Sequence, residues 1–183
     1  MILNNYWNLK GYAQTHYIPQ IPCSKTVVDI GLKNTSGSAA TFLASGNSSL
    51  TSYSVNIVAT ISTNYPLLYG LTARIGTGLT DPTTEDYNLT SDVTSSFSNY
   101  QVSINSSAED GICKVTITVS GTNTSSNSIT ITEIGLFRDV ITDADNYHQF
   151  SRATIMLVHE SLTTPITVPS GQGFTLTFEW GES

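Results

Sequence analysis

Apolar and polar residues alternate along most of this chain, the pattern of β-strands that bury one face. The alternation is clearest at 53–61 and 67–75, where every second residue is apolar and a Thr-Asn-Tyr-Pro turn lies between the two segments. No segment of ten or more residues has its apolar residues at helical spacing. Further strand patterns, separated by turn-forming residues, lie at 27–32, 39–43, 100–104, 113–119, 129–137, 150–158 and 174–180.

This series of strands predicts an all-β fold. About nine or ten strands, spaced about ten to fifteen residues apart, are typical of an antiparallel β-sandwich or a jelly-roll-like domain. Disorder is disfavoured, because 39% of the residues are hydrophobic and they alternate. Residues 113–119 are expected to form a hairpin with 129–137 through the turn SGTNTSSN.

The alternation is broken inside the segment 129–137. The isoleucines before Glu133 and the apolar residues after it fall on opposite faces, with Gly135 also at the shift. One extra residue in a strand produces such a shift, so the pattern predicts a β-bulge. A carboxylate beside a bulge needs a partner if it is buried, and we expect Arg152 or backbone amides to supply it.

We interpret Glu133 and Arg152 as a structural ion pair that fixes the register of the strand. The alternative is a catalytic carboxylate whose pKa a neighbouring cation adjusts. That alternative is disfavoured because the sequence fixes no second acid or nucleophile nearby.

The first 26 residues differ from the rest of the chain. They contain aromatic residues and prolines without a period of 2 or 3.6, which indicates an extended N-terminal arm that packs on another surface. That surface could be a neighbouring subunit or the protein's own domain, which would span 27–183. The aromatic residues expected to contact a partner are Tyr6, Trp7, Tyr12 and Tyr17.

Charge narrows the range of partners. Only 11% of the residues are charged, the formal net charge is −7, and the seven Lys and Arg residues are scattered. A nucleic-acid surface needs a cluster of cations to neutralise phosphates, so we expect no direct nucleic-acid contact. No apolar run approaches the length of a membrane span, and no secretory signal is visible, so we expect no membrane association.

The sequence offers no motif for catalysis or for a cofactor. HExxH, GxSxG and P-loop patterns are absent, and the three histidines are widely separated. The acidic stretches 81–92 and 143–147 lack the glycine and distal glutamate of an EF-hand, so we interpret them as solvated turns rather than metal sites. We therefore predict a protein that is not an enzyme and has no cofactor or metal.

Tyrosines in the strand region allow one binding hypothesis. A platform of coplanar rings could stack on a sugar, as in carbohydrate-binding β-sandwiches, although packing within the sheet is the more common role of a strand tyrosine. The candidates for glycan stacking are Tyr65, Tyr69 and Tyr87.

Two blocks of the sequence resemble virion proteins of tailed bacteriophages. The first is ITEIGLF at 131–137, followed by Arg152 and by a closing strand after a Pro-x-x-Val-x-x-Gly turn. The second, ARIGTGLTDPTTEDYNLTSDVTS at 73–95, is similar to the iGtG…pt…Dy.L segment that precedes the EIGL strand in those proteins. The order and rough spacing of the two blocks match.

This resemblance implies a non-enzymatic virion structural protein, either an auxiliary (decoration) protein of the capsid or the base of a head fibre. It implies many copies, homo-oligomer formation, and capsid or other virion proteins as partners, after synthesis in the host cytoplasm. The acidic charge favours the outer surface of the virion over its DNA-lined interior. The alternatives are a carbohydrate- or receptor-binding module of the phage tail or fibre, and a β-sandwich hydrolase with converging carboxylates.

Overall fold

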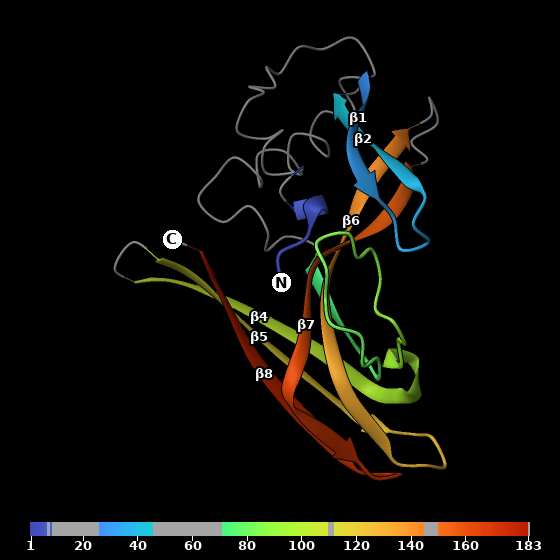
Figure 1. The fold of residues 1–183 in the computed structure, drawn as a ribbon, viewed down its shortest axis with the longest axis vertical. Helices are drawn as coiled ribbons and strands as arrows, with labels where there is room; N and C mark the ends of the chain where they lie inside the picture. Colours follow the sequence, from blue (N-terminus) through green and yellow to red (C-terminus); the bar gives the residue numbers. More distant parts are fainter. Residues whose placement is uncertain (7, 9–25, 46–70, 110–111, 145–149, 183) are drawn as a thin grey trace. The chain divides into compact units, whose positions relative to one another are not determined.

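The computed structural model describes residues 1–6, 8, 26–45, 71–109, 112–144 and 150–182, and within them the chain is mostly β-strand (Figure 1). This confirms the all-β class. A short 3₁₀ helix, η1, spans Thr94–Ser96. The strands are β1 (Thr26–Lys33), β2 (Ala39–Ser45), β3 (Leu71–Gly76), β4 (Phe97–Glu109), β5 (Ile112–Asn123), β6 (Ile129–Ala144), β7 (Phe150–Val168) and β8 (Gly173–Glu182).

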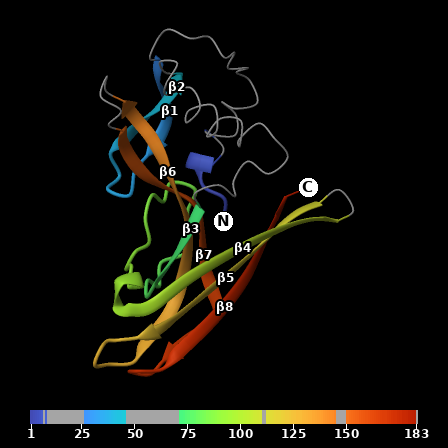
Figure 2. The ribbon, with the colours of Figure 1, turned by 180° about the vertical axis from the view of Figure 1, so that it is seen from behind.

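The strands form three sheets. The orders are β1-β2, β3-β6-β7 and β4-β5-β8, and the described pairings of β1 with β2, β4 with β5 and β5 with β8 are antiparallel. In both views β4, β5 and β8 run side by side as one twisted ribbon (Figures 1 and 2). Every strand segment predicted within the described residues lies in one of these strands. The segment 53–61 and residues 67–70 lie outside the described residues, and the sandwich arrangement stays a prediction.

The expected hairpin between 113–119 and 129–137 is wrong. β5 pairs with β4 along one edge and with β8 along the other, whereas β6 lies between β3 and β7 in a different sheet. Turn chemistry predicts that neighbours in sequence pair, but both edges of β5 are already occupied. The chain after β5 therefore continues into the other sheet.

Asn123 organises that connection. Its side chain is buried and donates to the carbonyls of Asn127 and Val168, both at 2.9 Å. Its own carbonyl accepts from the N–H of Gly171, also at 2.9 Å, and its side-chain oxygen accepts from the N–H of Ser125. One amide side chain thus joins the ends of β5 and β7 to the turn between β5 and β6.

The chain divides into two compact units. The first unit comprises Met1–Leu71, Thr83–Asn88 and Leu136–His159, and the second comprises Thr72–Pro82, Leu89–Gly135 and Glu160–Ser183. β6 and β7 contribute residues to both. The proposed division at residue 26 stays a prediction.

The start of the chain packs inside the first unit. Ile2 pairs with Val158 of β7, and Leu3 and Tyr6 are buried. The Asn5 side chain donates to the carbonyls of Lys33 and Met156 at 2.8 and 3.1 Å, and it accepts from the N–H of Lys33 at 2.8 Å. These first residues therefore form part of the core of the unit.

This packing corrects one expectation about the arm. Tyr6 is 1% exposed within a single chain, so its ring is not available to a partner. Aromatic residues without strand periodicity can equally line a core, and here the pairing of the first residues with β7 carries Tyr6 inward. Trp7, Tyr12 and Tyr17 lie outside the described residues, and their contact with a partner stays a prediction.

The core of the second unit lies under β4, β5 and β8. Ile117 and Val119 are buried, and the rings of Phe97 and Phe174 meet edge to face at 5.0 Å. The pairing of β4 with β5 shifts register between Ser98 and Gln101, where Asn99 has a φ of 50°.

Tyr100, next to this irregularity, joins two sheets of the second unit. Its hydroxyl donates to the carbonyl of Ala73 in β3 at 3.0 Å. Burial raises the pKa of Tyr100, so the hydroxyl keeps its proton and remains a donor.

Asn123→Ala should reduce the free energy of unfolding by about 2 to 3 kcal/mol, because it leaves the buried carbonyl of Val168 without this donor. Asn127→Ala, an exposed side chain in the same turn, should change it by less than about 0.5 kcal/mol. Urea unfolding followed by circular dichroism measures both. Equal effects of the two substitutions would show that Asn123 does not organise the connection.

Candidate functional site

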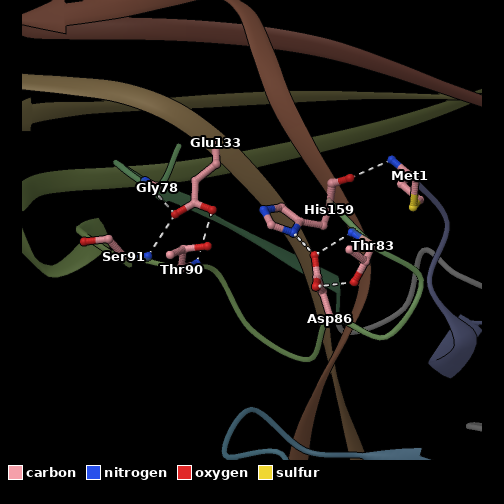
Figure 3. Close-up of polar contacts among 8 residues, drawn as sticks. All are labelled: Met1, Gly78, Thr83, Asp86, Thr90, Ser91, Glu133 and His159. Atoms are coloured by element: carbon pink, nitrogen blue, oxygen red, sulfur yellow. Dashed lines mark hydrogen bonds and ion pairs between the residues drawn. The ribbon is translucent and has the colours of Figure 1, made fainter. Parts of the chain in front are cut away.

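Glu133, on β6, accepts hydrogen bonds from three backbone amides. Oε1 accepts from the N–H groups of Gly78 and Ser91, both at 2.9 Å, and Oε2 accepts from the N–H of Thr90 at 3.2 Å. The side chain is 0% exposed. Figure 3 shows the carboxylate surrounded by these three residues, and we call this arrangement the carboxylate clamp.

The glycines of the IGTG motif make room for the clamp. A Cβ atom at Gly76 would overlap Glu133 Oε1, and one at Gly78 would lie 2.6 Å from the same oxygen. The Gly78 carbonyl accepts from Thr132 Oγ1 at 2.6 Å, and the N–H of Thr77 donates to the carbonyl of Ser91 at 2.9 Å. Glycine is therefore needed here because the carboxylate and the segment 90–91 together occupy the space of a side chain.

The clamp makes Glu133 a structural group. A buried carboxylate is costly unless it is hydrogen-bonded, and bonds from backbone amides to an ionised acceptor are among the stronger ones. Both oxygens are engaged, and the residue has no exposed surface. The clamp holds two segments, 76–78 and 90–91, against β6.

Two expectations about Glu133, the ion pair with Arg152 and the β-bulge in its strand, stay predictions. The Arg152 side chain lies outside the described residues, so the ion pair is untested. Residues 131–138 are all buried, so both faces of β6 are covered in this stretch. That burial is a second explanation of the broken alternation beside the β-bulge, because a strand covered on both faces need not alternate.

Side-chain contacts around Thr94 stabilise the segment that directly follows the clamp residues Thr90 and Ser91. The N–H of Ile75 donates to Thr94 Oγ1 at 3.1 Å, and the N–H of Thr94 donates to Asp92 Oδ1 at 2.8 Å. Arg74 and Asp92 add an ion pair of 3.6 Å between partly exposed side chains. Such a pair contributes little by itself, so the hydrogen bonds are the main support.

The first unit holds a separate polar cluster around Asp86. Asp86 Oδ2 lies 2.6 Å from Nδ1 of the buried His159, and Asp86 also accepts from the N–H and the hydroxyl of Thr83 at 2.9 and 2.7 Å (Figure 3). Burial acts to raise the pKa of Asp86, but the hydrogen bonds from Thr83 and then the contact with His159 outweigh it and hold that pKa below 3.8.

The geometry of this cluster is that of a structural link. The Thr83 hydroxyl bonds to the carboxylate rather than to the imidazole, so it is not placed as a nucleophile activated by His159. The cluster attaches residues 83–86 to β7. Glu85 extends the attachment, accepting from Asn4 at 2.6 Å and pairing with Lys33 at 3.1 Å.

Of the tyrosines proposed for glycan stacking, the structure describes only Tyr87. It is 41% exposed, and its ring covers Gly37, where an added Cβ would lie 2.9 Å from the ring. Tyr65 and Tyr69 lie outside the described residues, so the stacking platform stays a prediction.

No group of three or more His, Cys, Asp or Glu side chains that could hold a metal occurs among the described residues. No described helix is long and apolar enough to cross a membrane.

The sequence reasoning missed several links. Asn5, Asn123 and the contact of Asp86 with His159 were not anticipated. For the clamp itself a signal existed, because two glycines two residues apart mark a close approach of the backbone to another group. What that group is cannot be read from Gly76 and Gly78 alone.

Comparison of the chain with protein-family models, with curated proteins and with solved structures gives no match.

A pair of substitutions tests the spatial basis of the clamp. Gly78→Ala should reduce the free energy of unfolding by about 2 to 4 kcal/mol, because the added methyl collides with Glu133 Oε1 and with Thr90 Cβ. In a Glu133→Ala background the same substitution should cost at least about 1 kcal/mol less, since the collision with the carboxylate is gone and only that with Thr90 remains. Urea unfolding of the four proteins gives the coupling.

Gly173→Ala is the matched control for this cycle. An added Cβ at Gly173 would meet its nearest atom at 3.6 Å, so its effect should stay within about 0.5 kcal/mol. Strictly additive effects of Gly78→Ala and Glu133→Ala would contradict the clamp.

The Asp86 cluster predicts a pH effect. Because the folded-state pKa of Asp86 lies below its ordinary value of 3.8, the cluster stabilises the fold above about pH 4, and this contribution is lost as pH falls below 3.8. Asp86→Asn should therefore be less stable than the natural protein at pH 7, and the gap should narrow below pH 4. Thr83→Val should reproduce part of the gap. Thermal unfolding between pH 3 and 7 measures it, and curves that stay parallel would disprove the coupling.

Proposed function

We propose that this chain is a non-enzymatic structural protein of a tailed-bacteriophage virion, an auxiliary (decoration) or head-fibre-base component of the capsid. The observation that carries the proposal is the carboxylate clamp. Its acceptor, Glu133, lies in the ITEIGLF block, and its donors, Gly78, Thr90 and Ser91, lie in the block 73–95. The two blocks that carry the resemblance are therefore parts of one hydrogen-bonded unit.

The chemistry of the buried acids favours a structural role. The oxygens of Glu133 are occupied by backbone amides, and Asp86 is occupied by Thr83 and His159. A general acid or base has to reach a substrate proton, and neither of these groups is arranged to do so. Both instead fix loop segments to strands, which is useful in a protein that presents a constant surface.

The surface suits a protein displayed on the outside of a particle. Thr175, Thr177 and Glu179 are exposed on one face of β8, and Thr118 and Thr177 form a cross-strand contact of 3.2 Å. Uncharged hydroxyls keep such a face hydrated without a high density of charge. We place the protein on the outer surface of the virion, in many copies, after synthesis in the host cytoplasm.

The basic residues support protein partners rather than nucleic acid. Among the described residues, Lys33 pairs with Glu85, Arg74 pairs with Asp92, and Arg138 is buried. These cations do not form the exposed cluster that binding to phosphates requires. The partners we propose are capsid or other virion proteins, including further copies of this chain.

A receptor- or glycan-binding module of the tail or fibre is the second candidate. The observation in its favour is the partly exposed ring of Tyr87. One ring packed on Gly37 is a weaker basis than the clamp, because stacking on a sugar generally uses an array of rings.

Purified particles test the proposal. Virions of the phage that encodes the chain should contain it after density-gradient purification and a high-salt wash, and quantitative mass spectrometry should find many copies per particle. A cryo-electron-microscopy map should place these copies on the outside of the capsid. Particles that form without any copy of the chain, from lysates in which it is expressed, would refute the proposal.

A further inference from the structure

Leu79 is the most exposed large hydrophobic side chain in the described part of the chain. It is 86% exposed, against 43% for Met1 and 41% for Tyr87. Its neighbours Thr80 and Asp81 are exposed as well. Leu79 therefore stands at the tip of a polar loop that follows β3.

Gly78, the residue directly before Leu79, is held in place by hydrogen bonds. The N–H of Gly78 donates to Glu133 at 2.9 Å, and its carbonyl accepts from Thr132 Oγ1 at 2.6 Å. Gly78 itself is buried, one residue before a side chain that is almost fully in water. The backbone that presents Leu79 is thus held at both its donor and its acceptor by β6.

Single exposed leucines are common on protein surfaces and need no explanation by themselves. Leu79 differs because a buried carboxylate and the hydroxyl of Thr132 hold the backbone of the residue before it. A backbone segment held in place before binding loses little conformational entropy when a partner buries its side chain. Such a residue is suited to act as an anchor at an interface.

We infer that Leu79 inserts into an apolar pocket of a neighbouring virion protein and anchors this chain on the particle. The inference rests on the proposed function and names its contact residue. For the contact made by Leu79 the partner is a different protein, because a second copy of this chain would bring its own net charge of −7 to that contact. Asp81, two residues from the anchor, fits a pocket rimmed by Lys or Arg side chains.

Incorporation of variants into particles tests the anchor. In a phage lacking its own copy of the gene, limiting amounts of plasmid-encoded protein should load Leu79→Ser at least about tenfold less than the natural chain, because the buried apolar contact is lost. Leu79→Met keeps an apolar side chain and should load within about twofold. Thr175→Ala, at an exposed position on β8, should load normally. Because Leu79 and Thr175 are both exposed, all four proteins should unfold at similar urea concentrations.

Crosslinking tests the contact at position 79 directly, without a comparison of how well variants load. A benzoylphenylalanine placed at position 79 should form one defined adduct with a virion protein on irradiation, and the same probe at the exposed Thr175 should not form that adduct. Normal loading of Leu79→Ser, or no adduct from position 79, would overturn the inference. Flotation with phosphatidylcholine–phosphatidylglycerol vesicles that depends on Leu79 would also overturn it, in favour of a membrane.

The experiments can contradict the proposed function and the role of Leu79 separately. If the natural chain is absent from particles, the virion role is wrong and the stated partner with it. If the natural chain loads in many copies and Leu79→Ser loads equally well, the virion role stands and Leu79 is not its anchor.

Discussion

The structure depends on the burial of one carboxylate. Glu133 has no exposed surface, and its charge is tolerated because backbone amides of Gly78, Thr90 and Ser91 surround it. Removing the donors would leave a buried charge, and removing the acceptor would leave the amides without this partner. Neither half of the arrangement is stable alone, so the loop after β3 and the strand β6 specify each other across a large separation in sequence.

Two buried asparagine side chains make similar links between distant segments without carrying a charge. Asn5 joins Lys33 of β1 to Met156 of β7, and Asn123 joins the end of β7 to the turn after β5. In each case one buried side chain satisfies backbone groups of two distant segments. In a chain with only 11% charged residues, hydrogen bonds from side chain to backbone supply much of the specificity that ion pairs supply elsewhere.

The sequence predicted the strands well and their partners poorly. Alternation identified the fold class and strands such as β1, β2, β5 and β8, because a half-buried strand shows the period of 2 that burial imposes. It failed to give the pairing of β5, because the edge that a strand uses is decided by long-range packing. It also misjudged Tyr6, since an aromatic residue looks alike in an arm and in a core. The need of Glu133 for a partner was foreseeable from its chemistry, whereas the identity of its donors was not.

The fit between Glu133 and the two glycines has an evolutionary consequence. Gly78 and Glu133 are 55 residues apart, yet a side chain at Gly78 would collide with the carboxylate as well as with Thr90 Cβ. In a divergent relative, retention of the acid would forbid side chains at positions 76 and 78, and loss of the acid would remove one of the contacts that exclude them. A side chain at position 76 or 78 should therefore occur only in relatives that have lost the acid. A joint pattern of this kind can identify distant relatives whose overall sequence similarity has become undetectable.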